Sequence, residues 1–289
     1  MILVIGGRSK IGSALIGELV GKREPVRALV RSGECAGSFP DGVEAVTGDL
    51  ADLDSLRSAI AGAERMFLLC GPTEEEVQLN RNAIDAAKEA GVRLLVRSSI
   101  LGSVPGSPAT FVRDHGACDE YLRQSDVAHA IVRPNLFLQN VPENTIPSID
   151  GDGNFYANAG EARISMVDTR DVAAVAAILL TESGHEGNAY DVTGPEALSY
   201  HDVAAKLSAA MERSVTYIDA PDDAVRGALE GFGLPEWLTG ALVDLYQDYR
   251  RSGADGYAAQ VTDTVQQLTG RPPRTLGQLL AEQPAAAAQ

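Results

Sequence analysis

The chain has 289 residues, of which 45% are hydrophobic, and this is enough for one large α/β core together with a smaller lobe. It carries 40 acidic and 24 basic side chains, so its formal net charge at pH 7 is −16. This charge argues against nucleic acids and anionic membranes as partners, although a local group of arginines can still bind an anionic cofactor.

The cysteines and the apolar runs exclude further classes. Cys35, Cys70 and Cys118 do not have the spacing of a metal site or a redox motif, so we expect free thiols and no metal. No apolar run approaches the ~20 residues that a membrane span needs. The first residues lack the basic leader of a signal peptide. The sequence therefore predicts a cytoplasmic protein that does not contact a membrane.

Short apolar runs alternate with helical patterns along the first half of the chain. Strands are expected over residues 2–5, 26–30, 43–47, 66–70, 94–97 and 130–133. Helices are expected over 11–20, after the capping residue Asp52, and from the acidic run 74–76 to a stop at Gly91. Repeated β-α-β units with nearly continuous apolar strands predict an α/β fold, a doubly wound parallel sheet with helices on both faces.

The pattern loosens from about residue 140. A glycine-rich turn, a strand and a helix are expected over residues 151–180, with Asp171 as the expected helix cap. Strand, turn and helix are expected again over 189–211, and a further strand is expected in "SVTYIDA". We expect residues 1–140 to form a cofactor-binding domain that also receives elements from about residues 163–195. Residues 141–289 are expected to form mostly a small α+β lobe for a substrate or partner, interleaved with the sheet.

The opening "MILVIGGRSKIG" places a glycine-rich turn between the first strand and the first helix. Gly6 supplies the tight turn, Gly12 permits close packing of helix on strand, and Ser9 stands where a middle glycine is usual. A serine is small, and its hydroxyl can donate to a phosphate oxygen. In a chain of β-α units, this turn and the free N–H groups of the helix N-terminus predict a site for the pyrophosphate of a dinucleotide.

The carboxyl ends of the strands are where such sheets bind their ligands. The residues expected to contact the cofactor at this edge are Gly6, Arg8, Ser9, Lys10, Ile11, Gly12, Arg31, Ser32, Asp49, Leu50, Cys70, Gly71, Ser98, Pro134 and Phe137. Asp49 and Leu50 are placed to flank the adenine, although Asp49 can equally brace its own turn.

The stretch "VRALVRSG" indicates which dinucleotide is bound. A sheet of this kind that prefers NAD usually has an acidic residue after its second strand to bind the ribose 2′-hydroxyl. Here the position holds Arg31, followed by Ser32, and Arg8 lies in the first loop. Because a guanidinium binds a phosphate bidentately, these residues favour NADP(H) over NAD(H).

Stretches along nearly the whole chain resemble the NmrA-like atypical short-chain dehydrogenases/reductases. They are "VRALVRS", "GDLADLDSL", "VRSSILG", "HGACDEYLRQSDVAHAIVRPNLFLQN", "VDTRDVAAVAAILL", "YDVTGPEALSYHDVAAKLS" and "LTGRPPRTLGQLL". The resemblance implies a Rossmann-like domain, a small C-terminal substrate lobe and NADP(H). Some members of that family reduce quinones or similar small molecules, and others sense the NADP(H)/NADP⁺ balance without catalysis.

The catalytic positions depart from the wider superfamily, which uses a tyrosine and a lysine four residues later. His115 stands in the tyrosine position and Asp119 in the lysine position, on one face of an expected helix. Asp119 would stabilise the His115 imidazolium, which could then protonate a substrate oxygen. The alternative is a structural pair. Ser98 is a further catalytic candidate, and the expected pocket residues, which could equally be core, are Ser99, Leu138, Asn140, Phe155 and Tyr156.

The expected function is an NADPH-dependent oxidoreductase that transfers hydride to a small carbonyl, enone or quinone without the usual Tyr-Lys pair. For such acceptors the cofactor supplies the hydride, and the protein mainly has to hold acceptor and cofactor in the right orientation. The alternatives are a non-catalytic NADP(H) sensor that regulates a partner protein and a redox-neutral enzyme of secondary metabolism. A homodimer is also compatible with the sequence.

Overall fold

The computed structural model describes residues 1–31 and 39–282, and the chain forms two compact units. The first unit contains Met1–Gly106, Arg113–Arg133 and Thr169–Asp191. The second contains Ser107–Val112, Pro134–Asp168 and Val192–Gln289. Ser32 and Cys35 lie outside the described residues.

Seven strands form the sheet of the first unit, in the order β3-β2-β1-β4-β5-β6-β8. Their bounds are β1 Ile2–Ile5, β2 Val26–Val30, β3 Glu44–Thr47, β4 Arg65–Leu68, β5 Leu94–Ser98, β6 His129–Pro134 and β8 Ala189–Val192. The pairs among β1 to β6 are parallel, which confirms the predicted doubly wound sheet. The strand order reverses beside β1, so the loops after β1 and β4 flank the switch point where such sheets bind ligands.

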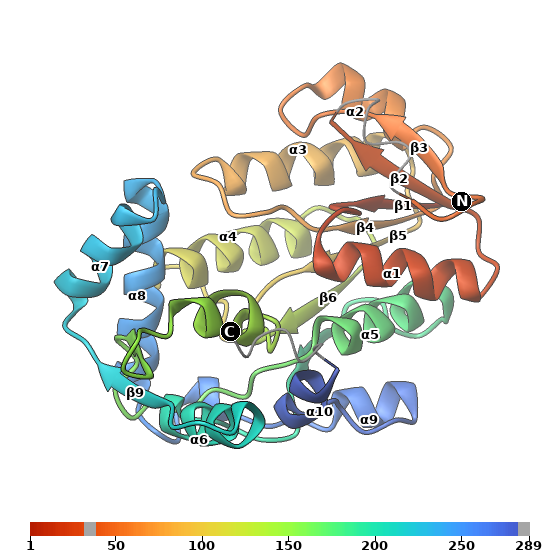
Figure 1. Ribbon diagram of the computed structural model, residues 1–289. Coiled ribbons are helices and arrows are strands. Elements are labelled where there is room, and N and C mark those ends of the chain that lie inside the picture. The colour runs from red at the N-terminus through yellow and green to blue at the C-terminus, as the bar shows by residue number, and fades with distance from the viewer. Residues whose placement is uncertain (32–38, 283–289) are drawn as a thin grey trace. The chain divides into compact units, whose positions relative to one another are not determined.

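Helices cover both faces of this sheet. They are α1 Lys10–Gly21, α2 Leu53–Ile60, α3 Glu76–Glu89, α4 Thr110–Gln124 and α5 Thr169–Thr181. Figure 1 shows α1 and α5 side by side on one face and α2, α3 and α4 on the other. The reason is the apolar face that each helix presents, as in α1, where Ile11, Leu15 and Leu19 are buried at helical spacing.

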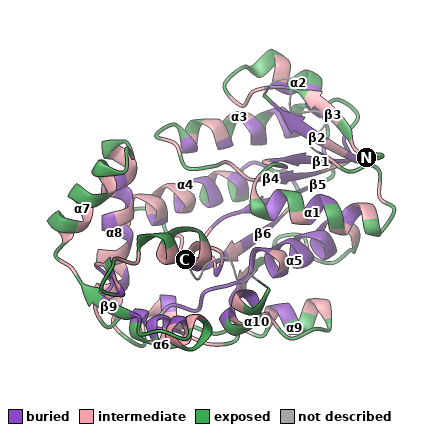
Figure 2. Cartoon of the chain, viewed as in Figure 1, coloured by how far each residue is buried: buried purple, intermediate pink, exposed green. Residues whose placement is uncertain are grey.

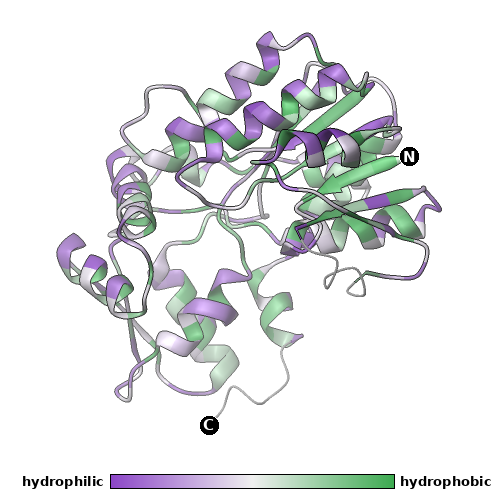
Figure 3. Ribbon diagram, turned by 90° about the horizontal axis from the view of Figure 1, so that it is seen from above, coloured by the Kyte–Doolittle hydropathy of each residue, from purple (hydrophilic) through white to green (hydrophobic). Residues whose placement is uncertain are grey.

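The core of the first unit is made by strand residues that alternate between the two faces. Leu3, Ile5, Met66 and Leu68 form one buried cluster with residues of α2, α3 and α4. The central strands are buried in Figure 2 and hydrophobic in Figure 3, as expected for a parallel sheet covered on both sides. Among the described residues, no helix is long and apolar enough to span a membrane.

Three predicted boundaries need correction. β4 ends at Leu68 rather than at residue 70. Of the acidic run 74–76, only Glu76 enters α3, and it is buried. α5 begins at Thr169, so Asp171 lies inside the first turn and does not cap the helix. The expected cap at Asp52 is confirmed, because its carboxylate accepts hydrogen bonds from the N–H groups of Asp54 and Ser55.

The second unit contains a two-stranded parallel sheet of β7 Asn154–Ala157 and β9 Thr216–Asp219. Its helices are α6 Tyr200–Met211, α7 Asp222–Gly231, α8 Glu236–Ser252, α9 Thr264–Thr269 and α10 Leu276–Ala281, with short helical turns at Val141–Thr145, Ile146–Ser148 and Tyr257–Ala259. Aromatic rings form much of its core: Tyr200 lies between Phe155, Tyr217 and Tyr246, with ring centroids 5.4 to 5.9 Å apart.

Candidate active site

The loop after β1 requires glycine at two positions. Gly6 has φ +82°, and a Cβ there would lie 2.6 Å from the Leu69 carbonyl oxygen. A Cβ on Gly12 would lie 2.1 Å from the Gly6 carbonyl oxygen. Larger side chains would therefore separate α1 from β1 and distort the turn.

Ser9 gives the N-terminus of α1 its cap. Its Oγ accepts a hydrogen bond from the Gly12 N–H at 3.0 Å, while the hydroxyl hydrogen remains able to donate to a ligand. The first turn of α1 contains no acidic residue that would repel an anion. This helix N-terminus, at the carboxyl end of β1, fits the pyrophosphate of a dinucleotide.

The two arginines expected at the ribose 2′-phosphate lie on neighbouring parallel strands. Arg8 is in the loop after β1, Arg31 directly follows β2, and both are exposed. They therefore share the carboxyl edge of the sheet. Lys10 is also exposed, but Ile11 is buried in the core, so only its backbone can face a ligand.

The turn after β3 is braced internally. Asp49 Oδ1 accepts a hydrogen bond from the Ala51 N–H at 2.9 Å, which matches the alternative role considered for this residue. Leu50 packs partly against the core cluster, and its carbonyl accepts from Asn82 at 2.8 Å. Beyond β4, Gly71 is exposed and Cys70 is a partly buried free thiol whose pKa is raised to about 12, mainly by burial.

Ser98 and Ser99 stand at the carboxyl end of β5, and both are buried. The Ser99 N–H donates to the Val132 carbonyl at 2.7 Å. The Ser99 Oγ has no hydrogen-bond partner among the described residues. A buried hydroxyl without a partner is uncommon, and it fits a polar atom of a ligand bound at this edge.

Most of the predicted pocket residues belong to the second unit. Phe137 and Asn140 are partly exposed, whereas Leu138 is buried. Phe155 is 1% exposed and packs against Tyr200 and Tyr217, so it is a core residue and not a pocket residue. Tyr156 is 52% exposed, and its hydroxyl donates to Asp150 Oδ2 at 2.9 Å. Pro134, the last residue of β6, is buried.

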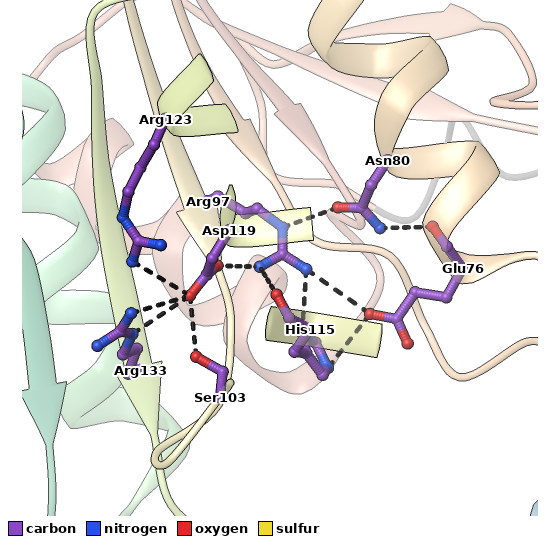
Figure 4. A network of polar contacts seen from close by, with 8 residues as sticks. All are labelled: Glu76, Asn80, Arg97, Ser103, His115, Asp119, Arg123 and Arg133. Carbon is purple, nitrogen blue, oxygen red and sulfur yellow. Dashed lines mark hydrogen bonds and ion pairs between the residues drawn. The ribbon is translucent and has the colours of Figure 1, made fainter. Parts of the chain in front are cut away.

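A buried network in the first unit centres on Arg97 of β5, as Figure 4 shows. Its Nε donates to Asn80 Oδ1 at 2.9 Å, and its Nη1 donates to Asp119 Oδ1. Its Nη2 lies 3.0 Å from His115 Nδ1. One guanidinium thus connects β5 with α3 and α4.

Asp119 does not pair with His115, which corrects the expected arrangement. Its Oδ1 bonds Arg97, and its Oδ2 accepts from Ser103 Oγ at 2.9 Å and from Arg133 Nη2 at 3.2 Å. The i, i+4 spacing does place both residues on one side of α4. However, the completely buried carboxylate is compensated by guanidinium groups from β5 and β6, which bind it more strongly than a neutral ring would.

His115 is held as a neutral ring instead of an imidazolium. Its side chain is 14% exposed, and its Nε2 lies 3.2 Å from Glu76 Oε1. Burial, and then the positive charge of Arg97, hold the pKa of His115 well below the ordinary 6.5. Glu76 is a nearby group that could stabilise a protonated ring, but burial and Arg97 outweigh it, so the ring stays neutral and is poorly suited to the expected acid role.

Sequence reasoning missed Arg97 and Glu76. From the sequence, Arg97 is expected to be the polar residue at the end of an apolar strand. Glu76 is expected to be exposed in the first turn of a helix, where the helix dipole favours an acidic side chain. The charge of Arg97 could have indicated this network. An arginine in a strand that helices cover on both faces needs a buried acidic partner. No group of three or more metal-ligating side chains occurs in the described part of the chain.

Comparison with known proteins identifies the family of this chain. Residues 6–183, more than half of the chain, match the family described as NAD(P)H-binding. The chain belongs to this NAD(P)H-binding family. The resemblance to the NmrA-like atypical short-chain dehydrogenases/reductases is confirmed at the level of the fold, since NmrA itself has a TM-score of 0.79 at 18% identity.

Full-length relatives of this NAD(P)H-binding chain include named reductases. The chain is 39% identical to the NAD(P)H azoreductase of Xenophilus azovorans, with 96% of each chain covered. It is 36% identical to the (4-alkanoyl-5-oxo-2,5-dihydrofuran-3-yl)methyl phosphate reductase of Streptomyces griseus, covering 98% of this chain and 97% of the relative. The NADPH complex of the Escherichia coli quinone oxidoreductase QOR2 has a TM-score of 0.88 at 28% identity, covering 97% and 99%.

Proposed function

We propose that this protein uses NADPH to reduce a small, electron-poor acceptor, a quinone or an enone, by hydride transfer. At the level of class the chain is an NAD(P)H-dependent oxidoreductase, as its full-length relatives are. The observation that carries the finer proposal is the state of His115 and Asp119. The first is neutral and the second is bonded to two arginines, so neither is a ready acid.

An acceptor without help from an acid must stabilise the incoming electrons itself. A quinone or an enone does so by delocalising the negative charge over its conjugated oxygen, whereas a simple ketone develops an alkoxide that needs a proton. This ranks quinones and enones above simple carbonyl compounds. The product anion of a quinone takes its proton from water.

The residues of the chain supply binding and orientation in this proposal. When bound, NADPH supplies the hydride. The backbone N–H groups after Gly6 and at the start of α1 hold the pyrophosphate, and Arg8 and Arg31 hold the 2′-phosphate. The unpartnered Ser99 Oγ donates to an acceptor oxygen or to the cofactor carboxamide.

The decisive experiment measures NADPH oxidation with a naphthoquinone, cyclohexenone and acetophenone as acceptors. We expect turnover with the first two and little with acetophenone. Tight NADPH binding without turnover of any acceptor would contradict the proposal and favour the sensor alternative. Rapid reduction of acetophenone would contradict the argument from the missing acid.

The choice of cofactor is tested with Arg31→Ala and with Arg93→Ala as a matched control. Arg93 precedes β5, at the opposite edge of the sheet, and forms a surface ion pair with Glu64. A charged hydrogen bond to phosphate contributes about 1.5–3 kcal/mol, so Arg31→Ala should weaken NADPH binding about 10- to 100-fold and leave NADH binding unchanged. Equal weakening of both cofactors would place the 2′-phosphate elsewhere.

A further inference from the structure

The His115 ring lies between two charged side chains that come from different elements. Arg97 Nη2, from β5, is 3.0 Å from Nδ1, and Glu76 Oε1, at the start of α3, is 3.2 Å from Nε2. The Glu76 side chain is only 4% exposed. Its Oε1 has no regular hydrogen bond within the described chain, so the contact with Nε2 is its main compensation besides Arg97 Nη2 at 3.7 Å.

We propose that Glu76 is a positioning residue of this site: its carboxyl group and the Arg97 guanidinium hold the His115 ring from opposite sides as a neutral imidazole whose hydrogen is on Nε2. α3 begins after β4, beside the switch point, so the held ring belongs to the carboxyl edge where the cofactor is expected. The consequence for turnover rests on the proposed function, but the state of the ring does not.

Arg97 determines which ring nitrogen carries the hydrogen. A guanidinium has only donors, so the nitrogen that faces it must be an acceptor. Nδ1 is therefore without hydrogen, and the single hydrogen of the neutral ring is on Nε2, facing Glu76. A second proton on Nδ1 would set two donors against each other at 3.0 Å, which excludes the imidazolium while the contact persists.

When the pH falls through neutrality, the group among Arg97, His115 and Glu76 that takes up a proton is therefore Glu76. Burial raises the pKa of Glu76 from 4.5 to about 7, Arg97 of β5 opposes the rise, and Asp114 of α4 adds to it. The thiols of Cys70, after β4, and Cys118, on α4, also interact electrostatically with this carboxyl group. Burial raises the pKa of Cys70 to about 12 and that of Cys118 to about 11, so both thiols stay neutral. With a proton on Oε2, Oε1 still faces Nε2 at 3.2 Å.

The charge on Glu76 should influence the reduction. An acceptor gains negative charge as hydride arrives, and a nearby carboxylate opposes this, whereas a neutral carboxyl group does not. Turnover should therefore fall as pH rises through about 7, the pKa of Glu76. A histidine acid would give a fall at lower pH, where His115 loses its proton.

The ring is observed directly by NMR of the full chain labelled with ¹⁵N-histidine, without cofactor. The His115 signals are those missing in His115→Gln. We expect a neutral ring with hydrogen on Nε2 at pH 6.5, where an ordinary histidine is half protonated, and up to pH 8, both in the wild type and in Glu76→Gln, which keeps an acceptor oxygen. In Glu76→Ala the ring loses one of the two groups that hold it, so the Arg97 contact, and with it the preference for Nε2, should weaken. A ring that titrates near its ordinary pKa in the wild type would overturn the proposal.

The effect on turnover is measured as kcat for naphthoquinone against pH. The wild type should fall from a higher to a lower plateau as pH rises through about 7, and Glu76→Gln, permanently neutral, should stay high and flat. The matched control is Glu75→Gln, which removes the same charge from the exposed neighbouring residue and should keep the wild-type profile.

An unchanged fall of kcat with pH in Glu76→Gln would overturn the link between Glu76 and turnover. Absence of any quinone reduction would refute the proposed function alone, because the NMR result stands independently.

Discussion

Glu76 is the residue whose burial most clearly opposes folding. Its pKa rises from 4.5 to about 7 in the folded chain, so the folded state binds more protons than the unfolded state between these values. The free energy of unfolding should therefore decrease as pH rises from about 4.5 to 7, and the loss, about 3 kcal/mol, is complete above pH 7. Glu76→Gln should remove this loss.

Urea unfolding at pH 5 and pH 8 tests this prediction. The difference between Glu76→Gln and the wild type should grow in favour of the variant at pH 8, by about 1–3 kcal/mol. Comparing variants cancels the contributions of other carboxylates, such as Asp222, whose pKa is lowered. Glu75→Gln is again the control. A variant that is less stable than the wild type at pH 8 would show that the Glu76 carboxylate is well compensated.

Single-residue roles were the least predictable part of the sequence. The spacing of His115 and Asp119 correctly predicts that they share one side of a helix, and α4 confirms that helix. Their partners come from β5 and β6, and Arg97 is 22 residues away from the Asp119 carboxylate that it binds. Nothing local in the sequence indicates that Arg97 lies between them, because this depends on the register of helix against sheet.

At the scale of elements, α1 shows how strongly one glycine can be required. Gly12→Ala should lower the melting temperature substantially and abolish NADPH binding, because the new Cβ would lie 2.1 Å from the Gly6 carbonyl oxygen. The matched control is Gly17→Ala in the same helix, where a Cβ meets nothing within 4 Å. This change should stabilise the chain by about 0.5–1 kcal/mol, the ordinary helix preference for alanine over glycine.

Thermal unfolding and NADPH titration of both variants give the readout. Retention of cofactor binding by Gly12→Ala would show that the loop can move away from the helix, and the pyrophosphate assignment would then lose its main support. A loss of stability in Gly17→Ala as large as that in Gly12→Ala would mean that α1 tolerates no added methyl group at all.

Elements were far more predictable than their contacts. The strands of the first unit were predicted to within about two residues, because buried parallel strands are short apolar runs bounded by polar residues. The errors fall at the ends: Asp171 resembled a cap but lies inside α5, and Phe155 resembled a pocket residue but lies in an aromatic core. Neither the start of a helix nor the face of a short strand is fixed by local pattern alone.

For the whole molecule, the net charge of −16 is the dominant electrostatic feature. Repulsion among the excess carboxylates destabilises the compact state, and added salt screens it. The melting temperature at pH 8 should rise by a few °C, on the order of 2–6 °C, between about 0.01 M and 0.15 M sodium chloride, as the screening length falls from about 30 Å to 8 Å.

Salt also weakens attractive ion pairs, but this effect is small, so the sign of the change in melting temperature shows whether repulsion among the carboxylates dominates. Surface pairs such as Arg57–Glu89 and Lys88–Asp126 also weaken in salt, but each contributes only about 0–1 kcal/mol. At pH 5 part of the acidic excess is protonated, so the same salt series should give a smaller rise. Potassium chloride should act like sodium chloride, since screening depends on ionic strength alone. A melting temperature that falls with salt at pH 8 would mean that paired charges outweigh the acidic excess, and the repulsion argument would be wrong.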